Sequence, residues 1–327
     1  MTDLLRWGIV GCGDVVEKKS GPSIRDAGAS RIVAIMRRDI DKARAFAEQY
    51  DVELCTDDPA AVIAHPHVDI VYVATPPAAH KAHVLAAAAA GKHVLVEKPM
   101  GLSADEDREM IAACREAGVE LFVAYYRRFQ PHVLRMKELL ETGAIGEPVS
   151  AQVDFAQPST GRDWGWRTQP AISGGGLFVD LVSHRIDLLV HLLGKPTAAH
   201  GLSATNDGRV ESAAALAVKF QGGAVASITG DFASPRRIDR LVLTGTQGII
   251  TTDDLDRQSF ELQRDGQIER LAFERFAAPH LGLIRHIQNV LAGNDVNRTS
   301  GEQAMHTDMI LDHGLARGEA ETASLTD

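Results

Sequence analysis

Continuous apolar runs and helical segments alternate about six times in the first third of the chain. The runs lack the regular polar residue at every second position, so we expect strands that are covered on both faces. Such strands belong to a doubly wound parallel sheet with helices on either side of it. The predicted strands include residues 7–10, 31–36, 68–74, 92–96 and 119–124, and the predicted helices include residues 41–50, 78–90 and 103–117.

The pattern changes beyond residue 125. Every second residue from Val149 to Phe155 is apolar, which is the period of a strand with one exposed face. Asp265-Gly266 between two short runs predicts a tight hairpin turn. We therefore expect an α/β chain of two domains, residues 1–124 and residues 125–327, the second with an open, mostly antiparallel sheet. Further elements predicted in the second domain are strands at residues 213–220 and 224–229 and helices at residues 177–193, 281–292 and 301–316.

Length, charge and cysteine content exclude several classes of protein. A chain of 327 residues, 45% of them hydrophobic, can bury about two domain cores, which excludes disorder as the main state. The net charge of −10 disfavours binding to nucleic acid or to an anionic membrane. The longest uncharged apolar run, residues 84–91, is too short to cross a bilayer. Three cysteines without paired spacing and an amino terminus without a targeting pattern favour reduced thiols in a cytoplasmic protein.

A glycine-rich turn follows the first predicted strand and opens a helix. Gly11-Cys12-Gly13 permits a tight turn in which backbone N–H groups approach a pyrophosphate at a helix N-terminus. We expect Gly11, Gly13, Asp14 and Val15 to bind a dinucleotide cofactor. The third glycine of the usual fingerprint is Val16 here, which we expect to loosen the packing of helix on strand. The alternative is a glycine turn that merely connects two elements.

The end of the second predicted strand distinguishes two cofactors. An acidic residue there would accept a hydrogen bond from a ribose 2′-hydroxyl, but the strand ends in Arg37 and Arg38. Two guanidinium groups suit a 2′-phosphate, so we expect NADP, with NAD as the alternative. Asp39 lies two residues beyond the usual acidic position.

Two further motifs follow the predicted strands at residues 68–74 and 92–96, namely Thr75-Pro76 with His80 and Glu97-Lys98-Pro99. A third motif, Asp180 with His184 after Gly174-Gly175-Gly176, lies in the second domain. With the glycine turn, these motifs resemble the Gfo/Idh/MocA family, the glucose–fructose oxidoreductase and inositol dehydrogenase group. The resemblance implies an N-terminal Rossmann domain, a substrate-binding second domain whose sheet joins subunits as a homodimer or homotetramer, and reversible hydride transfer to or from sugars, cyclic polyols or their oxidised derivatives.

The resemblance also implies roles for individual residues. Lys98 would bind a substrate oxygen and the cofactor ribose, and Glu97 would hold a ribose hydroxyl or orient that lysine. His184 would act as acid and base because the imidazole titrates near neutrality, with Asp180 orienting it or holding substrate. The cofactor would also contact Thr75, Pro76 and His80. The chemistry of the side chains adds three substrate contacts, because the guanidinium groups of Arg127 and Arg167 and the indole of Trp166 suit a hydroxylated or anionic substrate. The alternative for residues 164–166 is a packed loop that acts as a lid.

Several features carry a plainer interpretation. Asp180, His184, Asp187 and His191 follow helical spacing that suits a metal stripe, but the family chemistry needs no metal and we expect none. Asp187 and His191 are expected to be structural. The other histidines, His65 and His67 among them, are expected on the surface or in the core without chemistry. Two competing functions stay open: an enzyme that retains its nicotinamide for transient oxidation, such as a glycosidase or epimerase, and a non-catalytic dinucleotide sensor.

Overall fold

The computed structural model describes residues 4–159, 161–205 and 210–315, and these form two compact units. The first unit comprises residues up to 101, residues 105–126 and residues 276–305. The second comprises residues 102–104, residues 127–275 and residues 306–315 of the described chain. Residues 276–305, which lie beyond the boundary expected from sequence, thus pack with the first unit.

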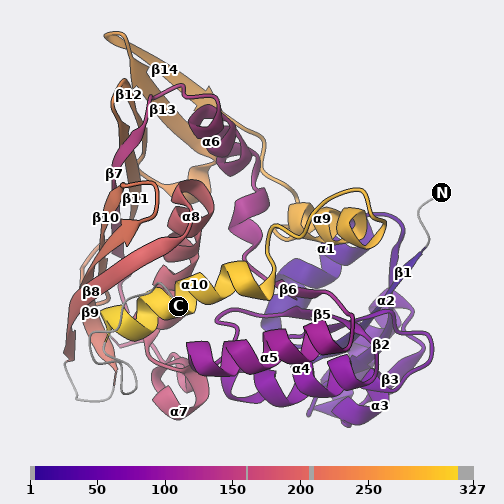
Figure 1. Cartoon of the computed structure of the whole chain (residues 1–327). Helices are drawn as coiled ribbons and strands as arrows, with labels where there is room; N and C mark the ends of the chain where they lie inside the picture. Colours follow the sequence, from indigo (N-terminus) through magenta and orange to yellow (C-terminus); the bar gives the residue numbers. More distant parts are fainter. Residues whose placement is uncertain (1–3, 160, 206–209, 316–327) are drawn as a thin grey trace. The chain divides into compact units, whose positions relative to one another are not determined.

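The first unit contains a six-stranded parallel sheet in the order β3-β2-β1-β4-β5-β6 (Figure 1). The order reverses at β1, so the crevice at the carboxyl ends of β1 and β4 is where such sheets bind ligands. The strands are β1 (Leu5–Val10), β2 (Ser30–Met36), β3 (Leu54–Thr56), β4 (Ile70–Val73), β5 (His93–Val96) and β6 (Leu121–Val123).

Helices of the first unit complete its doubly wound architecture. All four residues of β4 are buried, as the continuous apolar run predicts for a strand that is covered on both faces. Valines of five strands share one apolar core with α4 and α5. The helices are α1 (Gly21–Asp26), α2 (Ile40–Tyr50), α3 (Pro59–Ile63), α4 (His80–Ala89), α5 (Ala104–Glu116) and α9 (Leu281–Leu291).

The second unit contains an eight-stranded sheet in the order β14-β13-β12-β11-β7-β10-β9-β8 (Figure 1). All neighbours are antiparallel except β7 and β10, so the mostly antiparallel sheet is confirmed. The strands are β7 (Pro148–Ala156), β8 (Pro196–Thr205), β9 (Glu211–Phe220), β10 (Val225–Asp231), β11 (Ile238–Gly245), β12 (Gly248–Thr252), β13 (Ser259–Arg264) and β14 (Gln267–Ala272).

One face of this sheet is covered by helical segments. Buried and exposed residues alternate along β9 and β10, and the inward face of β10 packs against Phe178. The covering segments include a π-helical turn, η5 (Phe178–Val182), which leads directly into α8 (Ser183–Leu193). The remaining helices are α6 (Pro131–Glu141), α7 (Pro170–Ser173) and α10 (Gly301–Gly314); the predicted end of the last at residue 316 lies outside the described residues.

None of the helices in the described ranges is long and apolar enough to cross a membrane.

Candidate functional site

Gly11 lies at the carboxyl end of β1, where no larger residue fits. Its φ is +95°, and a Cβ atom there would lie 2.8 Å from the backbone of Ala74 and Thr75. The N–H groups of Gly11 and Cys12 both donate to the Met36 carbonyl oxygen, at 3.0 and 2.9 Å. The turn is therefore fixed between the ends of β2 and β4.

Gly13 faces a different environment. A Cβ atom on Gly13 would meet only the Gly11 oxygen, at 4.0 Å, so its open side is a cradle that a side chain would fill. Thr75, across the turn, has a buried hydroxyl with no hydrogen-bond partner among the described residues. An open glycine surface beside an unsatisfied hydroxyl fits a pyrophosphate and its ribose, so these residues fit the dinucleotide that the motif implies.

The helix after the glycine turn begins as a π-helical segment, η1 (Val16–Ser20). Val16, which replaces the third glycine of the fingerprint, is fully buried, so the chain accommodates the larger side chain within the core. Asp14 and Val15 precede this segment, and the Asp14 carboxylate is exposed and accepts a hydrogen bond from Lys18 at 2.6 Å.

The two arginines after β2 occupy different surroundings. Arg37 forms an ion pair with Glu17 of η1, and its side chain is 18% exposed. Arg38 is exposed. Asp39 caps α2, because its carboxylate accepts a hydrogen bond from the Lys42 N–H at 3.2 Å. The acidic side chain that follows the two arginines is thus already engaged by the helix.

His80 is fully buried beneath the ends of β4 and β5. Its Nε2 lies 2.7 Å from the Thr75 oxygen, and its Nδ1 lies 3.0 and 3.1 Å from the oxygens of Met100 and Pro99. Burial lowers the pKa of the imidazole, although the three carbonyl oxygens act in the opposite direction. The ring therefore ties the Thr75 turn to the segment after Lys98; a direct contact of His80 with cofactor stays a prediction.

A tyrosine of β4 forms a hydrogen bond with the motif that follows β5. Tyr72 donates a hydrogen bond of 2.5 Å to Glu97 Oε1, and the Lys98 N–H donates one of 3.2 Å to Glu97 Oε2. The peptide between Lys98 and Pro99 is cis. Tyr72 is completely buried, and burial, followed by the Glu97 charge, raises the pKa of its phenol well above the ordinary value. The phenol therefore stays protonated and acts as a hydrogen-bond donor. The sequence does not reveal this role, because Tyr72 is one residue of an otherwise apolar strand.

In the second unit, Asp180 and His184 lie on consecutive segments of one helix. Asp180 belongs to η5 and His184 to the first turn of α8, and both side chains are largely buried. Arg167 Nε donates to Asp180 Oδ2 at 3.0 Å, and its guanidinium lies over the Trp166 ring at 4.5 Å. The structure thus brings together four predicted residues of this unit, and π-helical turns within helices recur at functional sites.

Arg127, which we expected to contact substrate, lies in a network of ion pairs. Its Nη2 donates to Asp256 Oδ1 at 2.8 Å, and only 9% of its side chain is exposed. No local pattern in the sequence reveals this contact, because Asp256 lies 129 residues beyond Arg127. The remaining members are Arg185, Arg237, Asp239 and Asp254.

Asp187 is structural, as predicted. Arg128 binds both of its carboxylate oxygens, the shortest contact being 2.6 Å, and both side chains are buried. This pairing removes Asp187 from the hypothetical metal stripe.

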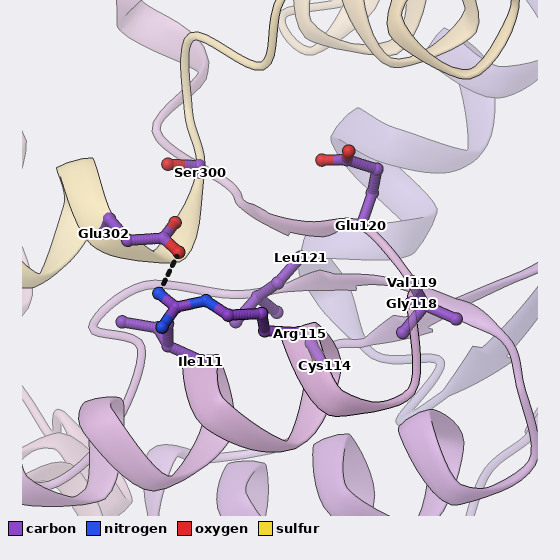
Figure 2. A pocket seen from close by; sticks show the side chains of 9 residues that line it. All are labelled: Ile111, Cys114, Arg115, Gly118, Val119, Glu120, Leu121, Ser300 and Glu302. Atoms are coloured by element: carbon purple, nitrogen blue, oxygen red, sulfur yellow. Dashed lines mark hydrogen bonds and ion pairs between the residues drawn. The ribbon is translucent and has the colours of Figure 1, made fainter.

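A pocket of about 350 Å³ lies elsewhere in the first unit, between the end of α5 and the segment that covers β6 (Figure 2). Arg115 and Glu302 point toward each other across it and form an ion pair of 3.0 Å. None of the predicted site residues lines this pocket. The full lining is Ile111, Cys114, Arg115, Gly118, Val119, Glu120, Leu121, Ser300 and Glu302.

Comparison with known proteins identifies the class to which this fold and these residues belong. Residues 5–125 match the model of an oxidoreductase family with an NAD-binding Rossmann fold, and residues 133–251 match the GFO/IDH/MocA C-terminal domain. The chain belongs to the Gfo/Idh/MocA family, and it is an NAD(P)-dependent oxidoreductase.

Three relatives illustrate the similarity. Oxidoreductase P35 of Formosa agariphila is 32% identical, over 95% of this chain and 98% of its own. The 1,5-anhydro-D-fructose reductase of Ensifer adhaerens is 30% identical, over 74% of each chain. The crystal structure of aldose-aldose oxidoreductase from Caulobacter crescentus, complexed with glycerol, has a TM-score of 0.87 at 25% identity and covers 94% of this chain and 95% of its own.

Proposed function

We propose that this protein transfers a hydride between NADP(H) and a secondary alcohol or carbonyl carbon of a sugar, cyclic polyol or keto-sugar derivative. The observation that carries the proposal is the location of Lys98, which follows a parallel strand at its carboxyl end, next to the strand whose end faces the glycine turn. A side chain there lies where a sheet of this class binds its ligand. The names of the relatives, a reductase of an anhydrosugar among them, support the substrate class.

Each proposed catalytic residue has one task. The bound nicotinamide supplies the hydride acceptor in oxidation and the hydride donor in reduction. As the carbon–hydrogen bond breaks in oxidation, His184 takes the hydroxyl proton and the Lys98 ammonium stabilises the developing negative charge on oxygen. In reduction His184 returns that proton to the oxygen. Asp180 and Arg167, which are already paired, hold hydroxyl groups of the substrate, with Trp166 beside them.

The preference for NADP rests on the end of β2. Arg37 and Arg38 offer guanidinium groups to a 2′-phosphate, whereas the Asp39 carboxylate caps α2 and so is not available to a ribose hydroxyl. Arg37 would exchange its contact with Glu17 for the phosphate. NAD remains the alternative cofactor.

One assay tests the proposal. A panel of polyols and keto-sugars is measured by nicotinamide absorbance with each dinucleotide, and the best pair is then used for the variants. Lys98→Ala and His184→Ala should each lower kcat by about 10²–10⁴-fold. Neither change should abolish NADP binding, because the glycine turn that holds the pyrophosphate is intact. The pH profile of oxidation should lose its limb near neutrality in His184→Ala.

Four results would contradict parts of this proposal. Near-normal turnover in both variants would remove Lys98 and His184 from the catalytic site. A higher kcat/KM with NAD than with NADP would reverse the cofactor preference. Tight dinucleotide binding without net turnover on any substrate would favour the sensor, and a nicotinamide that copurifies without exchange would favour the enzyme of transient oxidation.

A further inference from the structure

Two histidines and a glutamate meet at the amino ends of the strands of the first unit. His65 and His67 belong to the turn between α3 and β4, and Glu53 immediately precedes β3. The distance between His67 Nδ1 and Glu53 Oε2 is 3.0 Å, and the two imidazole rings lie edge to face with centroids 5.4 Å apart. One nitrogen or oxygen of each residue lies within 4.8 Å of those of the other two.

The backbone of this turn is fixed independently of the imidazole rings. The Val68 N–H donates to the His65 oxygen at 3.1 Å. Lys92, which immediately precedes β5, donates a hydrogen bond of 2.7 Å from its Nζ to the Val68 oxygen. The rings are therefore presented from a closed turn, with one ligand atom of each residue already within 4.8 Å of the others.

One nitrogen atom of the two imidazole rings lacks a hydrogen-bond partner among the described residues. His65 Nδ1 is buried and has no hydrogen-bond partner among the described residues. A buried polar atom of this kind is unfavourable unless something binds it. Because the neighbouring groups are a second imidazole and a carboxylate, a cation that accepts nitrogen and oxygen ligands would satisfy it.

Glu53 can serve as a ligand without losing its other contact. Its Oε1 lies 3.4 Å from Arg31 Nη1, which leaves Oε2 directed at His67. Ligating carboxylates commonly keep such a second partner. Arg31 opposes a bound cation, but it also lies 3.5 Å from the Asp51 carboxylate, which partly offsets its charge.

We propose that Glu53, His65 and His67 bind a divalent transition-metal ion, zinc foremost. Two imidazole nitrogens and one carboxylate oxygen suit zinc, whereas magnesium and calcium prefer oxygen ligands. Two ligands of a tetrahedral zinc ion lie about 3.3 Å apart, close to the present separation of His67 from Glu53. The site lies at the amino ends of the parallel strands, opposite the glycine turn, so the ion clamps two turns together and takes no part in hydride transfer.

The experiment uses the untagged full chain, stripped of metal with a chelator and then titrated with zinc. We expect one zinc ion per chain by calorimetry and a higher thermal midpoint on binding. His65→Ala and His67→Ala should each weaken zinc binding by at least about tenfold. His83→Ala is the matched control, since it removes a partly buried histidine of α4 in the same unit, and it should bind zinc as the parent does.

Cobalt provides a second readout that folding defects do not imitate. Cobalt bound to the parent protein should give the intense visible absorption bands that indicate a four- or five-coordinate ion. These bands should weaken in Glu53→Gln, a variant that preserves the shape of the side chain. Magnesium should leave the thermal midpoint unchanged. The proposal is overturned if zinc fails to bind at a small excess over protein, or if the double variant His65→Ala/His67→Ala binds it as tightly as the parent.

Discussion

Individual side chains in the candidate site are held by partners that the sequence does not pair with them. Glu97 and Lys98 were predicted from their motif, but the tyrosine that holds Glu97 lies 25 residues earlier in a buried strand. Asp180 and Arg167 were both predicted, yet their contact depends on a loop whose course no periodicity reveals. A motif therefore predicts which residues act, whereas the residues that position them require the folded chain.

Tyr72 provides the test at this scale. Tyr72→Phe keeps the buried ring and removes the hydrogen bond to Glu97, which is worth about 1.5–3 kcal/mol because its acceptor is charged. We expect the KM for the dinucleotide to rise about tenfold while kcat changes less, since Glu97 would be free to rotate away from the ribose. Steady-state kinetics with varied cofactor provides the measurement.

Ser20→Ala is the control for Tyr72→Phe. The Ser20 hydroxyl donates to the other side of the same phenol, at 3.3 Å, so its loss leaves the bond to Glu97 intact. Equal KM values in Tyr72→Phe and the parent would show that Glu97 needs no support from the phenol.

Whole elements were predictable where local chemistry decides the conformation. Continuous apolar runs predicted five of the six parallel strands, all but the three-residue β3. The Asp265-Gly266 turn is confirmed with positive φ values of 51° and 72°, as a tight hairpin requires. Strand β8 was missed because six of its ten residues are exposed and it has no apolar run. Strand β11 was missed because Asp239 within it is buried against Arg185, a partner 54 residues away. The two π-helical segments leave no pattern that distinguishes them from α-helix.

The glycine turn yields a prediction for an element as a unit. Gly11→Ala places a Cβ at positive φ and 2.8 Å from backbone atoms, so it should destabilise the fold by about 1–3 kcal/mol or more. Gly13→Ala has open space, so its stability should stay within about 0.5 kcal/mol of the parent. Its dinucleotide affinity should nevertheless fall at least tenfold or so, because the new methyl group occupies the cradle.

Denaturant titration and binding of reduced dinucleotide by fluorescence separate these two effects. The pair of variants serves as its own control, since both change glycine to alanine within three residues. Parent-like binding in Gly13→Ala would mean that the cofactor does not lie against this turn.

The whole molecule carries an exposed sheet face that we expect to join subunits. Leu202 on β8 is 83% exposed, and its neighbours across β9 and β10 are the small, exposed Ala215 and Thr229. A patch of small and apolar residues on the outward face of β8, β9 and β10 is suited to pairing with a second copy of itself. We expect light scattering to give a multiple of the 35.2 kDa chain mass, and Ala217→Arg to reduce it to a single chain.

A charged substitution on the surface of the first unit is the control for this test of oligomerisation. Val296→Glu changes an exposed residue of the first unit and should leave the mass unchanged. A parent protein that is monomeric at micromolar concentration would contradict the prediction.

Acid should destabilise the molecule through histidines that are buried in both units. Burial lowers the pKa of His132 to about 4 and that of His280 to about 3, whereas an unfolded histidine titrates near about 6.5. Above about pH 6.5 neither state binds the proton, so these groups do not affect stability. Below that pH the two histidines are protonated in the unfolded chain but not in the native chain. The free energy of unfolding therefore falls by about 1.4 kcal/mol per pH unit for each histidine.

His132 isolates one of these protons. His132→Asn retains a polar group near Nδ1 that can bond Gln258, now 2.9 Å from that atom, and removes the titrating ring. For His132 the lost stability reaches about 3 kcal/mol by pH 4. The thermal midpoint of the parent should therefore fall more steeply between pH 6.5 and 4 than that of the variant. Parallel pH profiles for the two proteins would mean that His132 is protonated in the native state, which its burial in the second unit opposes.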